Sequence, residues 1–463
     1  MILIRNVKVV DGTGQPAYPA DVLISGDRIS AIGSFPHRKA DSIIDGLGAY
    51  LCPGFIDVHS QADHYLKIFT DPGQSQYLEQ GITTIIGGQD GASLAPLLYG
   101  SLKSIQKYTD TNQINVNWHS FAEFTQTLKK LSLAVNFGSL IGHSTIRRDL
   151  THDAFTDLTD PELAVFKKMI GQALAEGGLG LSVGLNTVHA RRVPQQEIKE
   201  LLTEVAAGNG LYAARLRDEK GGLVNAVNET IFVYKATGVR TIIGRFQPLL
   251  GSERQFDLAL KILEEAGDGI FFDISPQASR LLPAYVLLPE WAQVGGLKEM
   301  LAFIADTNNR QRILEWLPKN QGNLVIKETT PAHRYLIGKN LKDFAANRKL
   351  SLQRGLLELL LLTEMKLILE VPDVNEEKLK EVILHDRALI TSPVAKFLEV
   401  AEAQRWPLER AVAKLTSLPA RVLGLTARGL IKENYFADLV LIKDKKVQQV
   451  LVNGSNGGQL ITS

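Results

Sequence analysis

The feature that most limits the fold of this chain is a regular alternation of short apolar segments with longer amphipathic segments. The alternation begins at Gly54 and continues over roughly 300 residues, which is typical of parallel strands joined by crossover helices. Because a closed barrel is a common way to complete such a sheet, the pattern predicts a TIM-like barrel. The strand-like segments are Thr83–Ile86, Val135–Ile141, Gly180–Val183, Gly210–Arg215, Thr241–Arg245 and Gly269–Ile274, and the helical segments include Pro161–Glu176, Pro194–Ala207 and Glu253–Ala266.

Both ends of the chain carry strand patterns without helices between them. The N-terminal strands are separated by turn signals such as Asp11-Gly12 and Gly26-Asp27, which suits a meander. We therefore predict one small β-domain built from residues 1–53 and 420–463, and a barrel over residues 54–419 with a helical insertion around residues 285–347. The strands expected in the small domain are Ile2–Ile4, Lys8–Val10, Asp21–Ser25, Arg28–Ile32, Ala437–Ile442 and Lys446–Asn453.

Charge and cysteine content narrow the functional classes. The 463 residues include 51 basic and 50 acidic side chains, a net charge of +1, which favours neither nucleic acid nor a membrane as partner. Cys52 is the single cysteine, which excludes an intramolecular disulfide and a cysteine-based zinc site. The N-terminal segment does not resemble a signal peptide, and the most apolar run, Leu356–Leu362, is too short to cross a bilayer. We therefore expect a cytoplasmic location.

One motif marks the end of the first barrel strand. The segment Pro53-Gly54-Phe55-Ile56-Asp57-Val58-His59-Ser60-Gln61 resembles the Pro-Gly-x-Ile-Asp-x-His-x-His motif of amidohydrolases. Two histidines one residue apart on a strand point to the same face, so both can bind one metal ion. Further motifs make the chain similar to the N-acyl-D-amino-acid deacylases, or D-aminoacylases, of the amidohydrolase superfamily. They are Gln80-Gly81-Ile82-Thr83-Thr84, Gly142-His143-Ser144-Thr145-Ile146-Arg147, Tyr212-Ala213-Ala214-Arg215-Leu216-Arg217-Asp218-Glu219, Thr416-Ser417-Leu418-Pro419-Ala420 and Ala437-Asp438-Leu439-Val440.

The resemblance implies a fold and a reaction. The fold would be α/β, a distorted TIM-like (β/α)8 barrel with a small β-sandwich domain formed by both chain ends. The reaction would be hydrolysis of an N-acyl-D-amino acid by metal-activated water, with zinc as the Lewis acid. It also requires a carboxylate to transfer the proton and a cation to hold the carboxylate of the substrate.

The chain departs from the family at several positions of the metal site. His59 matches the first histidine of the pair, but Gln61 stands in the place of the second. Asp90 occupies the turn that carries the family's metal-binding cysteine. Two further histidines correspond to Arg215 and Arg245, whose side chains offer only donors and a permanent positive charge. We therefore expect no cofactor, although the family implies zinc.

The residues expected to do the remaining chemistry also differ. Gln247 stands where the family has a lysine that helps to hold the substrate. The family's catalytic aspartate should follow the last barrel strand, but Leu389–Pro393 contains no acid there. Asp386 is the nearest acid, and it precedes that strand. The sequence therefore identifies no catalytic residue.

Two interpretations of the arginines remain open. In one, Arg215, Arg245 and Asp90 form an ion-pair network that replaces the metal; in the other, the arginines bind an anionic ligand through their planar guanidinium groups. His143, Arg217, Asp218 and Gln247 are further pocket or ligand candidates, and the triplet Arg217–Glu219 is expected to form a structural ion pair. His64 and His189 match no family role and are expected in surface or loop positions.

The sequence thus predicts a D-aminoacylase-like pseudoenzyme, catalytically inactive or repurposed as a binding or assembly protein. Its partner would be a protein, such as an active homologue or a second copy of the chain, or a small anionic ligand. The alternative is a hydrolase of non-peptide C–N bonds, such as the amides of N-acyl-D-amino acids, that uses an altered and metal-independent site. His59, Asp90 and Arg245 would then carry proton transfer and oxyanion stabilisation.

Overall fold

The computed structural model describes residues 1–319 and 323–455. Its centre is a barrel of parallel strands made from a six-stranded sheet, ordered β17-β13-β12-β11-β10-β9, and a three-stranded sheet, β6-β7-β8. Since β8 and β9 follow one another along one strand position, the two sheets supply eight barrel positions. The bounds are β6 (Phe55–Asp57), β7 (Ile82–Gly87), β8 (Asn136–Ser139), β9 (Ile141–Gly142), β10 (Gly180–Gly184), β11 (Leu211–Arg215), β12 (Arg240–Gly244), β13 (Ile270–Ile274) and β17 (Ala388–Ile390).

The barrel is distorted at the seam between its first and last strands. Among the described strands, β6 and β17 share no ladder of backbone hydrogen bonds. Side chains bridge this seam instead: the amide of Ser392 donates to Asp57 at 3.4 Å, and the amide of Val394 donates to Gln80 at 3.0 Å. The architecture confirms the predicted distorted TIM-like barrel.

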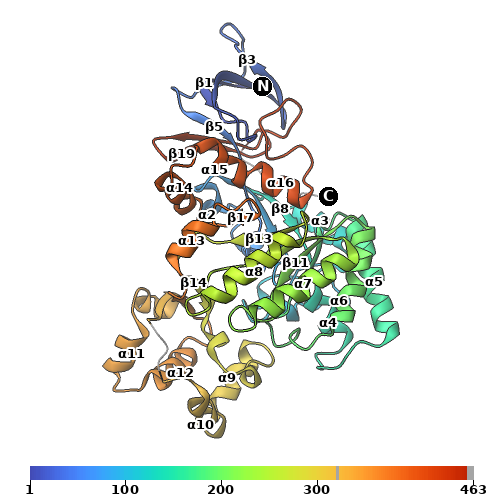
Figure 1. Ribbon diagram of the computed structural model, residues 1–463, viewed down its shortest axis with the longest axis vertical. Coiled ribbons are helices and arrows are strands. Elements are labelled where there is room, and N and C mark those ends of the chain that lie inside the picture. Colours follow the sequence, from blue (N-terminus) through green and yellow to red (C-terminus); the bar gives the residue numbers. More distant parts are fainter. Residues whose placement is uncertain (320–322, 456–463) are drawn as a thin grey trace.

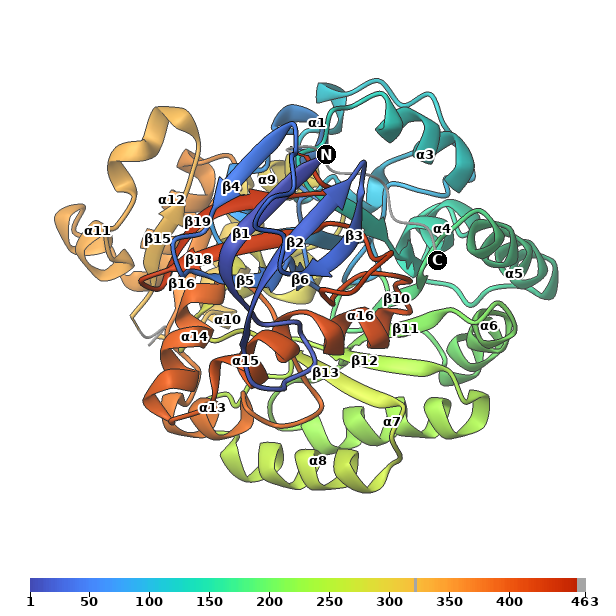
Figure 2. The same cartoon turned by 90° about the horizontal axis from the view of Figure 1, so that it is seen from above.

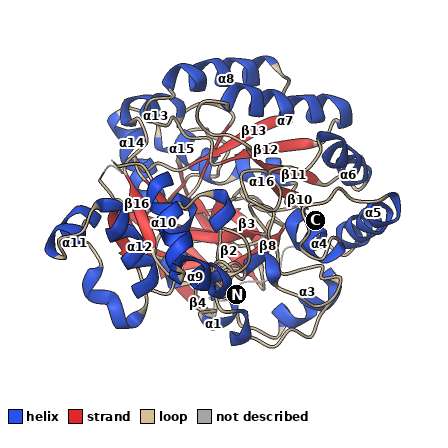
Figure 3. Cartoon of the chain, turned by 90° about the horizontal axis from the view of Figure 1, so that it is seen from below, coloured by secondary structure: helices blue, strands red, loops and turns tan. Residues whose placement is uncertain are grey.

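Helices cover the outside of the barrel, as the amphipathic segments predicted. In Figure 3, α5 to α8 lie in an outer row beside strands β10 to β13. Helix α5 begins where predicted because Thr159 and Glu162 form a capping box and Pro161 follows at the start of the first turn. The helices around the barrel are α1 (Lys67–Thr70), α2 (Ser75–Leu78), α3 (Phe121–Lys129), α4 (His143–Leu150), α5 (Asp160–Ala175), α6 (Gln195–Ala207), α7 (Leu223–Thr237), α8 (Glu253–Glu265), α13 (Glu376–Val382), α14 (Val394–Ala403), α15 (Leu408–Leu415) and α16 (Ser417–Leu423), with 3-10 turns η1 (Lys103–Ile105) and η2 (Thr111–Gln113).

A seven-stranded sheet made by both chain ends covers one end of the barrel (Figures 1 and 2). The C-terminal strand β18 pairs antiparallel with β5, which places Val440 opposite Cys52. The predicted small domain was to begin at residue 420, but that position falls inside α16, whose Val422 and Leu423 pack in one buried cluster with Ile56 of the barrel. The bounds are β1 (Ile2–Val9), β2 (Tyr18–Ser25), β3 (Arg28–Gly33), β4 (Ser42–Asp45), β5 (Tyr50–Pro53), β18 (Leu439–Lys443) and β19 (Lys446–Leu451); residues 456–463 of the predicted domain lie outside the described part.

The insertion lies at the opposite end of the molecule and has its own buried core (Figure 1). It was predicted to be helical over residues 285–347, but it extends from β14 to β16 and contains a three-stranded antiparallel sheet. The apolar run Leu356–Leu362 lies within α12, and its leucines form part of this core. The elements are β14 (Arg280–Pro283), η3 (Ala284–Leu287), η4 (Glu290–Ala292), α9 (Leu297–Ala305), α10 (Thr307–Trp316), β15 (Val325–Glu328), η5 (Pro331–Leu336), α11 (Leu341–Asn347), α12 (Leu352–Leu362) and β16 (Ile368–Val371). Within residues 1–319 and 323–455, no helix has the length and apolar character needed to cross a membrane.

Candidate functional site

The carboxyl ends of the barrel strands bring five of the key side chains together. His59 follows β6, Asp90 follows β7, Arg215 ends β11, Arg245 follows β12 and Asp273 lies in β13. Parallel strands end at the same mouth of the barrel, which is where ligands bind in this fold. The side chains of this set are largely buried, although that of Arg245 keeps 27% of its surface exposed. We call these five residues the mouth cluster.

The backbone conformation orients two of these side chains toward the mouth cluster. Asp90 and Arg245 both have a left-handed backbone, with φ of 53° and 52°. This conformation is uncommon outside glycine, and it reverses the chain directly after a strand. The turn before Asp90 also needs Gly88, because a Cβ atom there would lie 2.1 Å from the carbonyl oxygen of Leu140.

Asp90 is the centre of the cluster. One of its oxygens lies 3.4 Å from Nε2 of His59 and 3.5 Å from Nη2 of Arg245. The other accepts from Nη1 of Arg215 at 3.4 Å, and the side-chain amide of Gln61 donates to Asp90 at 3.2 Å. Burial alone would raise the pKa of Asp90, but Arg245, His59 and Arg215 outweigh burial and hold its pKa well below that of an ordinary carboxyl group. Asp90 is therefore ionised at neutral pH.

Asp273 was not identified from the sequence, and it orients two members of the cluster. It accepts from Nδ1 of His59 at 2.8 Å and from the backbone amide of Arg245 at 2.8 Å. Burial lowers the pKa of His59, but Asp273 and Asp90 outweigh burial and raise it to about 9. The raised pKa favours the imidazolium form of His59, in which Nδ1 donates to Asp273. Its Nε2 lies 3.4 Å from Asp90 and 3.3 Å from Nε of Arg245, which donates toward it. The only sequence signal for Asp273 is an acid inside the otherwise apolar strand Ile270–Ile274.

A chain of ion pairs continues outward from Arg215. Its Nε bonds to Glu219, which also pairs with Arg280 at 3.0 Å, and Arg280 pairs with Asp373 at 2.6 Å. Arg280 and Asp373 belong to the strands and loop that join the insertion to the barrel. His59, Arg215 and Arg245 therefore face Asp90, Asp273 and Glu219, so positive and negative groups balance. This is the arrangement that the ion-pair interpretation predicts.

The remaining predicted pocket residues lie away from the mouth cluster. His143 is fully buried and bonds to Glu197 at 2.8 Å, and Arg147 binds the same carboxylate at 2.9 Å. Arg217 pairs with Glu229 at 2.7 Å, so the expected ion pair within the triplet Arg217–Glu219 is replaced by a partner on α7. Asp218 accepts from the amide of Lys220 at 2.7 Å, and the side chain of Gln247 donates to the carbonyl of Ser275 at 3.1 Å.

Three further positions lie in loops outside the mouth cluster. His64 lies in the turn segment between β6 and α1, where it is fully buried and its Nε2 donates to the carbonyl oxygen of Ala92 at 2.9 Å. His189 is also largely enclosed: burial and nearby cations lower its pKa to about 3, and its ring stacks on Phe155. Asp386 is exposed and precedes β17, which places it at the end of the barrel away from the mouth. It therefore cannot replace a catalytic aspartate.

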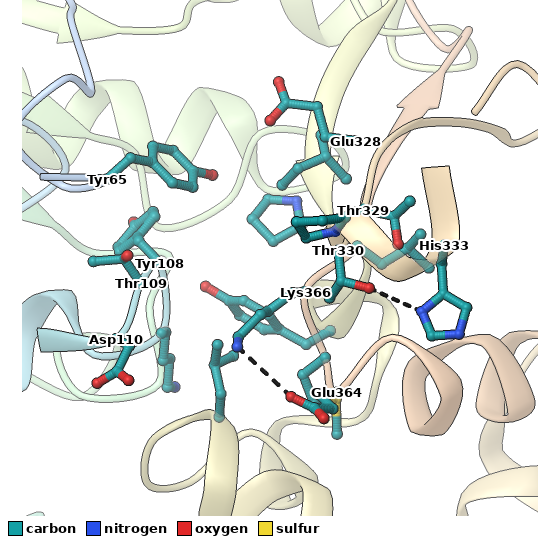
Figure 4. Close-up of a pocket in the computed structure, with 18 of the residues that line it drawn as sticks. Tyr65, Tyr108, Thr109, Asp110, Glu328, Thr329, Thr330, His333, Glu364 and Lys366 are labelled. Atoms are coloured by element: carbon teal, nitrogen blue, oxygen red, sulfur yellow. Dashed lines mark hydrogen bonds and ion pairs between the residues drawn. The ribbon is translucent and has the colours of Figure 1, made fainter. Parts of the chain in front are cut away.

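Two cavities lie beside Tyr65, and the smaller one reaches the mouth. The larger has a volume of about 580 Å³ and lies between barrel loops and the insertion. Figure 4 shows Tyr65 and Tyr108 on one wall, with Glu328 and His333 on the facing wall. The smaller, of about 240 Å³, is lined by His59 and Gln61 of the mouth and shares Tyr65 with the larger cavity. His143, Arg217, Asp218 and Gln247 line neither cavity.

Comparison with known proteins shows which proteins the chain resembles. No family model matches the chain. The chain is 29% identical to D-aminoacylase of Alcaligenes xylosoxydans xylosoxydans over 456 residues, which cover 95% of this chain and 87% of that relative. It is 25% identical to N-acyl-D-aspartate deacylase of the same organism over 463 residues, which cover 96% of this chain and 86% of that relative. Over nearly its whole length the chain is similar to the D-aminoacylases.

Solved structures agree with the D-aminoacylase fold. The structure of N-acyl-D-glutamate deacylase from Bordetella bronchiseptica, complexed with zinc and a phosphonate inhibitor, has a TM-score of 0.83 and 24% identity and covers 100% of this chain and 99% of that chain. D-hydantoinase from Thermus sp. has a TM-score of 0.52 and 15% identity, with 100% of this chain and 99% of that chain covered. These neighbours confirm the amidohydrolase barrel with its separate sheet.

The zinc that the family resemblance implies does not fit the mouth of this D-aminoacylase-like chain. In residues 1–319 and 323–455, no three His, Cys, Asp or Glu side chains form a group that could hold a metal ion. The donors at the mouth are already engaged, since His59 lies between two carboxylates and Asp90 lies between two guanidinium groups. A cation placed beside Asp90 would also meet the permanent charges of Arg215 and Arg245.

Proposed function

We propose that this D-aminoacylase-like protein acts as a binding or assembly protein and does not hydrolyse amides through zinc. The observation that carries the proposal is the pairing of Arg215 and Arg245 with Asp90 at the barrel mouth. Both arginines correspond to metal-binding histidines of the family. Here they form ion pairs with a carboxylate of the chain itself. The bound metal normally polarises the substrate carbonyl and activates water, contributions of several kcal/mol each.

Two kinds of partner are consistent with this role. The first is a small anionic ligand, because Arg245 keeps part of its guanidinium surface exposed. The second is another protein, either a homologue or a second copy of this chain. Arg245 lines neither cavity, but the smaller cavity contains His59 and Gln61 of the mouth and offers a small ligand a place.

Zinc content tests the proposal directly. The protein is expressed in zinc-supplemented medium, dialysed extensively and measured by mass spectrometry for metal per chain. We expect far less than one equivalent of zinc and no deacylation of N-acyl-D-amino acids. A triple variant, Gln61→His with Arg215→His and Arg245→His, is the matched positive control and should gain zinc. Near-stoichiometric zinc in the unaltered protein, with deacylase activity, would overturn the proposal.

The alternative function is hydrolysis of an amide or related C–N bond without metal. It is favoured by the His59–Asp273 pair, since a histidine oriented by a carboxylate is a common general base. The raised pKa of His59 argues against this role at neutral pH, because its ring nitrogens already carry protons. A metal-independent hydrolase would therefore show activity in the presence of a chelator, rising as the pH approaches 9, and lost in His59→Gln. Absence of turnover across this range removes the alternative.

A further inference from the structure

The smaller cavity, which we call the seam cavity, lies where the first and last barrel strands share no hydrogen-bond ladder. Its wall combines the loop after β6, the segment around α1 and α2, and Ser392 after β17. None of the motifs that resemble the family accounts for Lys67, which forms part of this wall. The seam cavity is therefore a feature that the proposed ion-pair cluster does not explain.

The charges around the seam cavity are one-sided. His59 and Lys67 line it, and no carboxylate does. The larger cavity differs, because its wall mixes the lysines Lys107 and Lys366 with the carboxylates of Asp110, Glu328 and Glu364. In the seam cavity the polar lining groups are cationic, amide and hydroxyl groups, so no lining carboxylate opposes an anion.

The two cations of the seam cavity are not equivalent. The charge of His59 is matched by Asp90 and Asp273. The ammonium group of Lys67 has no ion pair or hydrogen bond with any residue of the described ranges, 1–319 and 323–455. Within the same ranges the side-chain amide of Gln76, at the rim, has none either. One positive charge is therefore uncompensated, next to an amide donor that is available to a ligand.

We propose that the seam cavity binds a small organic monocarboxylate, held by the ammonium group of Lys67 and the side-chain amide of Gln76. One uncompensated ammonium matches one carboxylate, and charge-assisted hydrogen bonds of this kind are stronger than neutral ones. A dianion such as phosphate would leave an excess negative charge close to the carboxylate of Asp90, which pairs with His59 of the cavity wall. The volume of about 240 Å³ admits a compact molecule and excludes a folded segment of protein. This inference rests on the proposed binding role and assigns its ligand a class and a place.

The test uses the full-length protein and propionate as the probe. Binding is measured by calorimetry and by ligand-observed NMR at low ionic strength, with propionamide as the neutral isostere. We expect propionate to bind and propionamide not to bind. Lys67→Met should lower the affinity for propionate by about tenfold or more, which is the effect of losing one hydrogen bond to a charged group. Lys67→Arg should retain the affinity. Lys129→Met, an exposed lysine of α3, is the matched control and should not change the affinity.

Several outcomes would overturn this site. They are equal affinity of propionate for Lys67→Met, equal affinity of propionamide and propionate, or binding of inorganic phosphate without binding of propionate. If Lys67→Met does not fold, as judged by its melting temperature, Gln76→Leu takes its place and should also lower the affinity for propionate. Zinc measured on the same samples separates the two proposals. Stoichiometric zinc would refute the proposed binding role, whereas the change in propionate affinity caused by Lys67→Met tests the seam cavity alone.

Discussion

At the residue scale, the mouth of this barrel depends on Asp90. Its carboxylate faces the guanidinium groups of Arg215 and Arg245, the ring of His59 and the amide of Gln61. Buried charges of this kind contribute little as a pair, yet the loss of one partner is costly because it leaves the others unpaired. The stability of the cluster should therefore fall more when Asp90 is replaced than when any single cation around it is replaced.

We predict that Asp90→Asn lowers the free energy of unfolding by about 3–5 kcal/mol at pH 7, since it leaves buried cations without their shared carboxylate. Urea unfolding followed by circular dichroism measures this loss. Asp41→Asn is the control, because Asp41 is 86% exposed and pairs with the N-terminal amine. That exposed pair should contribute far less to stability than the buried cluster. Equal losses in the two variants would show that the mouth cluster does not stabilise the fold.

The raised pKa of His59 predicts a loss of stability at alkaline pH. Its pKa is about 9 in the folded chain against 6.5 for an unperturbed histidine, so protonation stabilises the folded state. The contribution is complete below pH 6.5 and is lost as the pH rises through 9, a change on the order of 2–3 kcal/mol. Urea unfolding at pH 6.5 and at pH 9 should show this loss in the unaltered protein and a smaller one in His59→Gln. Identical pH dependence in both proteins would contradict the assignment of charge to His59.

At the scale of elements, strands buried on both faces were predicted well. The segments Gly180–Val183 and Thr241–Arg245 correspond closely to β10 and β12, because their apolar runs persist whichever neighbours they pack against. The short strands β4, β5 and β14 to β16 were not predicted. Each has only four residues, too few for a period to be recognised. Their pairing depends on partners far away along the chain.

The turn after β7 makes a specific prediction about two glycines. Gly88 and Gly26 both have positive φ, but a Cβ atom at Gly88 would collide with the backbone at Leu140 while nothing lies within 4 Å of one at Gly26. Gly26→Ala should therefore cost about 1–2 kcal/mol, the price of a left-handed backbone alone. Gly88→Ala should cost about 1–3 kcal/mol more, because the backbone must shift. Thermal unfolding of both variants measures the difference, and equal melting temperatures would refute the packing argument.

At the scale of the whole molecule, buried polar contacts join the sheet made by the chain ends to the barrel. The side-chain amide of Asn136 on β8 donates to Asp438 at 3.1 Å, and Arg428 pairs with the same carboxylate. Asn453 completes the network by donating to Asn136 at 2.8 Å. The C-terminal segment is thus attached to the start of barrel strand β8, so the two parts should unfold together.

Removal of the positive member of this network should destabilise both parts. We predict that Arg428→Met costs about 3–5 kcal/mol, because Asp438 is left buried without its counter-charge. Hydrogen exchange followed by mass spectrometry should show faster exchange in β1 of the sheet and in β11 of the barrel to the same extent. Arg348→Met, which changes an exposed arginine of the insertion, is the comparison. Faster exchange confined to the sheet would mean that the two parts unfold independently.

The sequence by itself indicated the resemblance to the D-aminoacylases and the barrel, and it predicted that Arg215 and Arg245 lie at the ends of barrel strands. These conclusions rest on local motifs and on periodicity, which can be recognised without knowing which distant residues are in contact. The predicted outline of the insertion was incomplete, and no local signal marked Lys67 as part of a cavity wall.

Only the tertiary structure decided how the charges are paired. The bond between His59 and Asp273 joins residues 214 positions apart, and Arg215 reaches Asp90 across 125 positions. Barrel closure brings such residues together, and the position of one carboxylate among several cations then sets their pKa values. An arginine at a strand end can either pair with a carboxylate of the chain or bind a ligand, and its residue type is the same in both situations. Only the positions of the neighbouring carboxylates decide between the two.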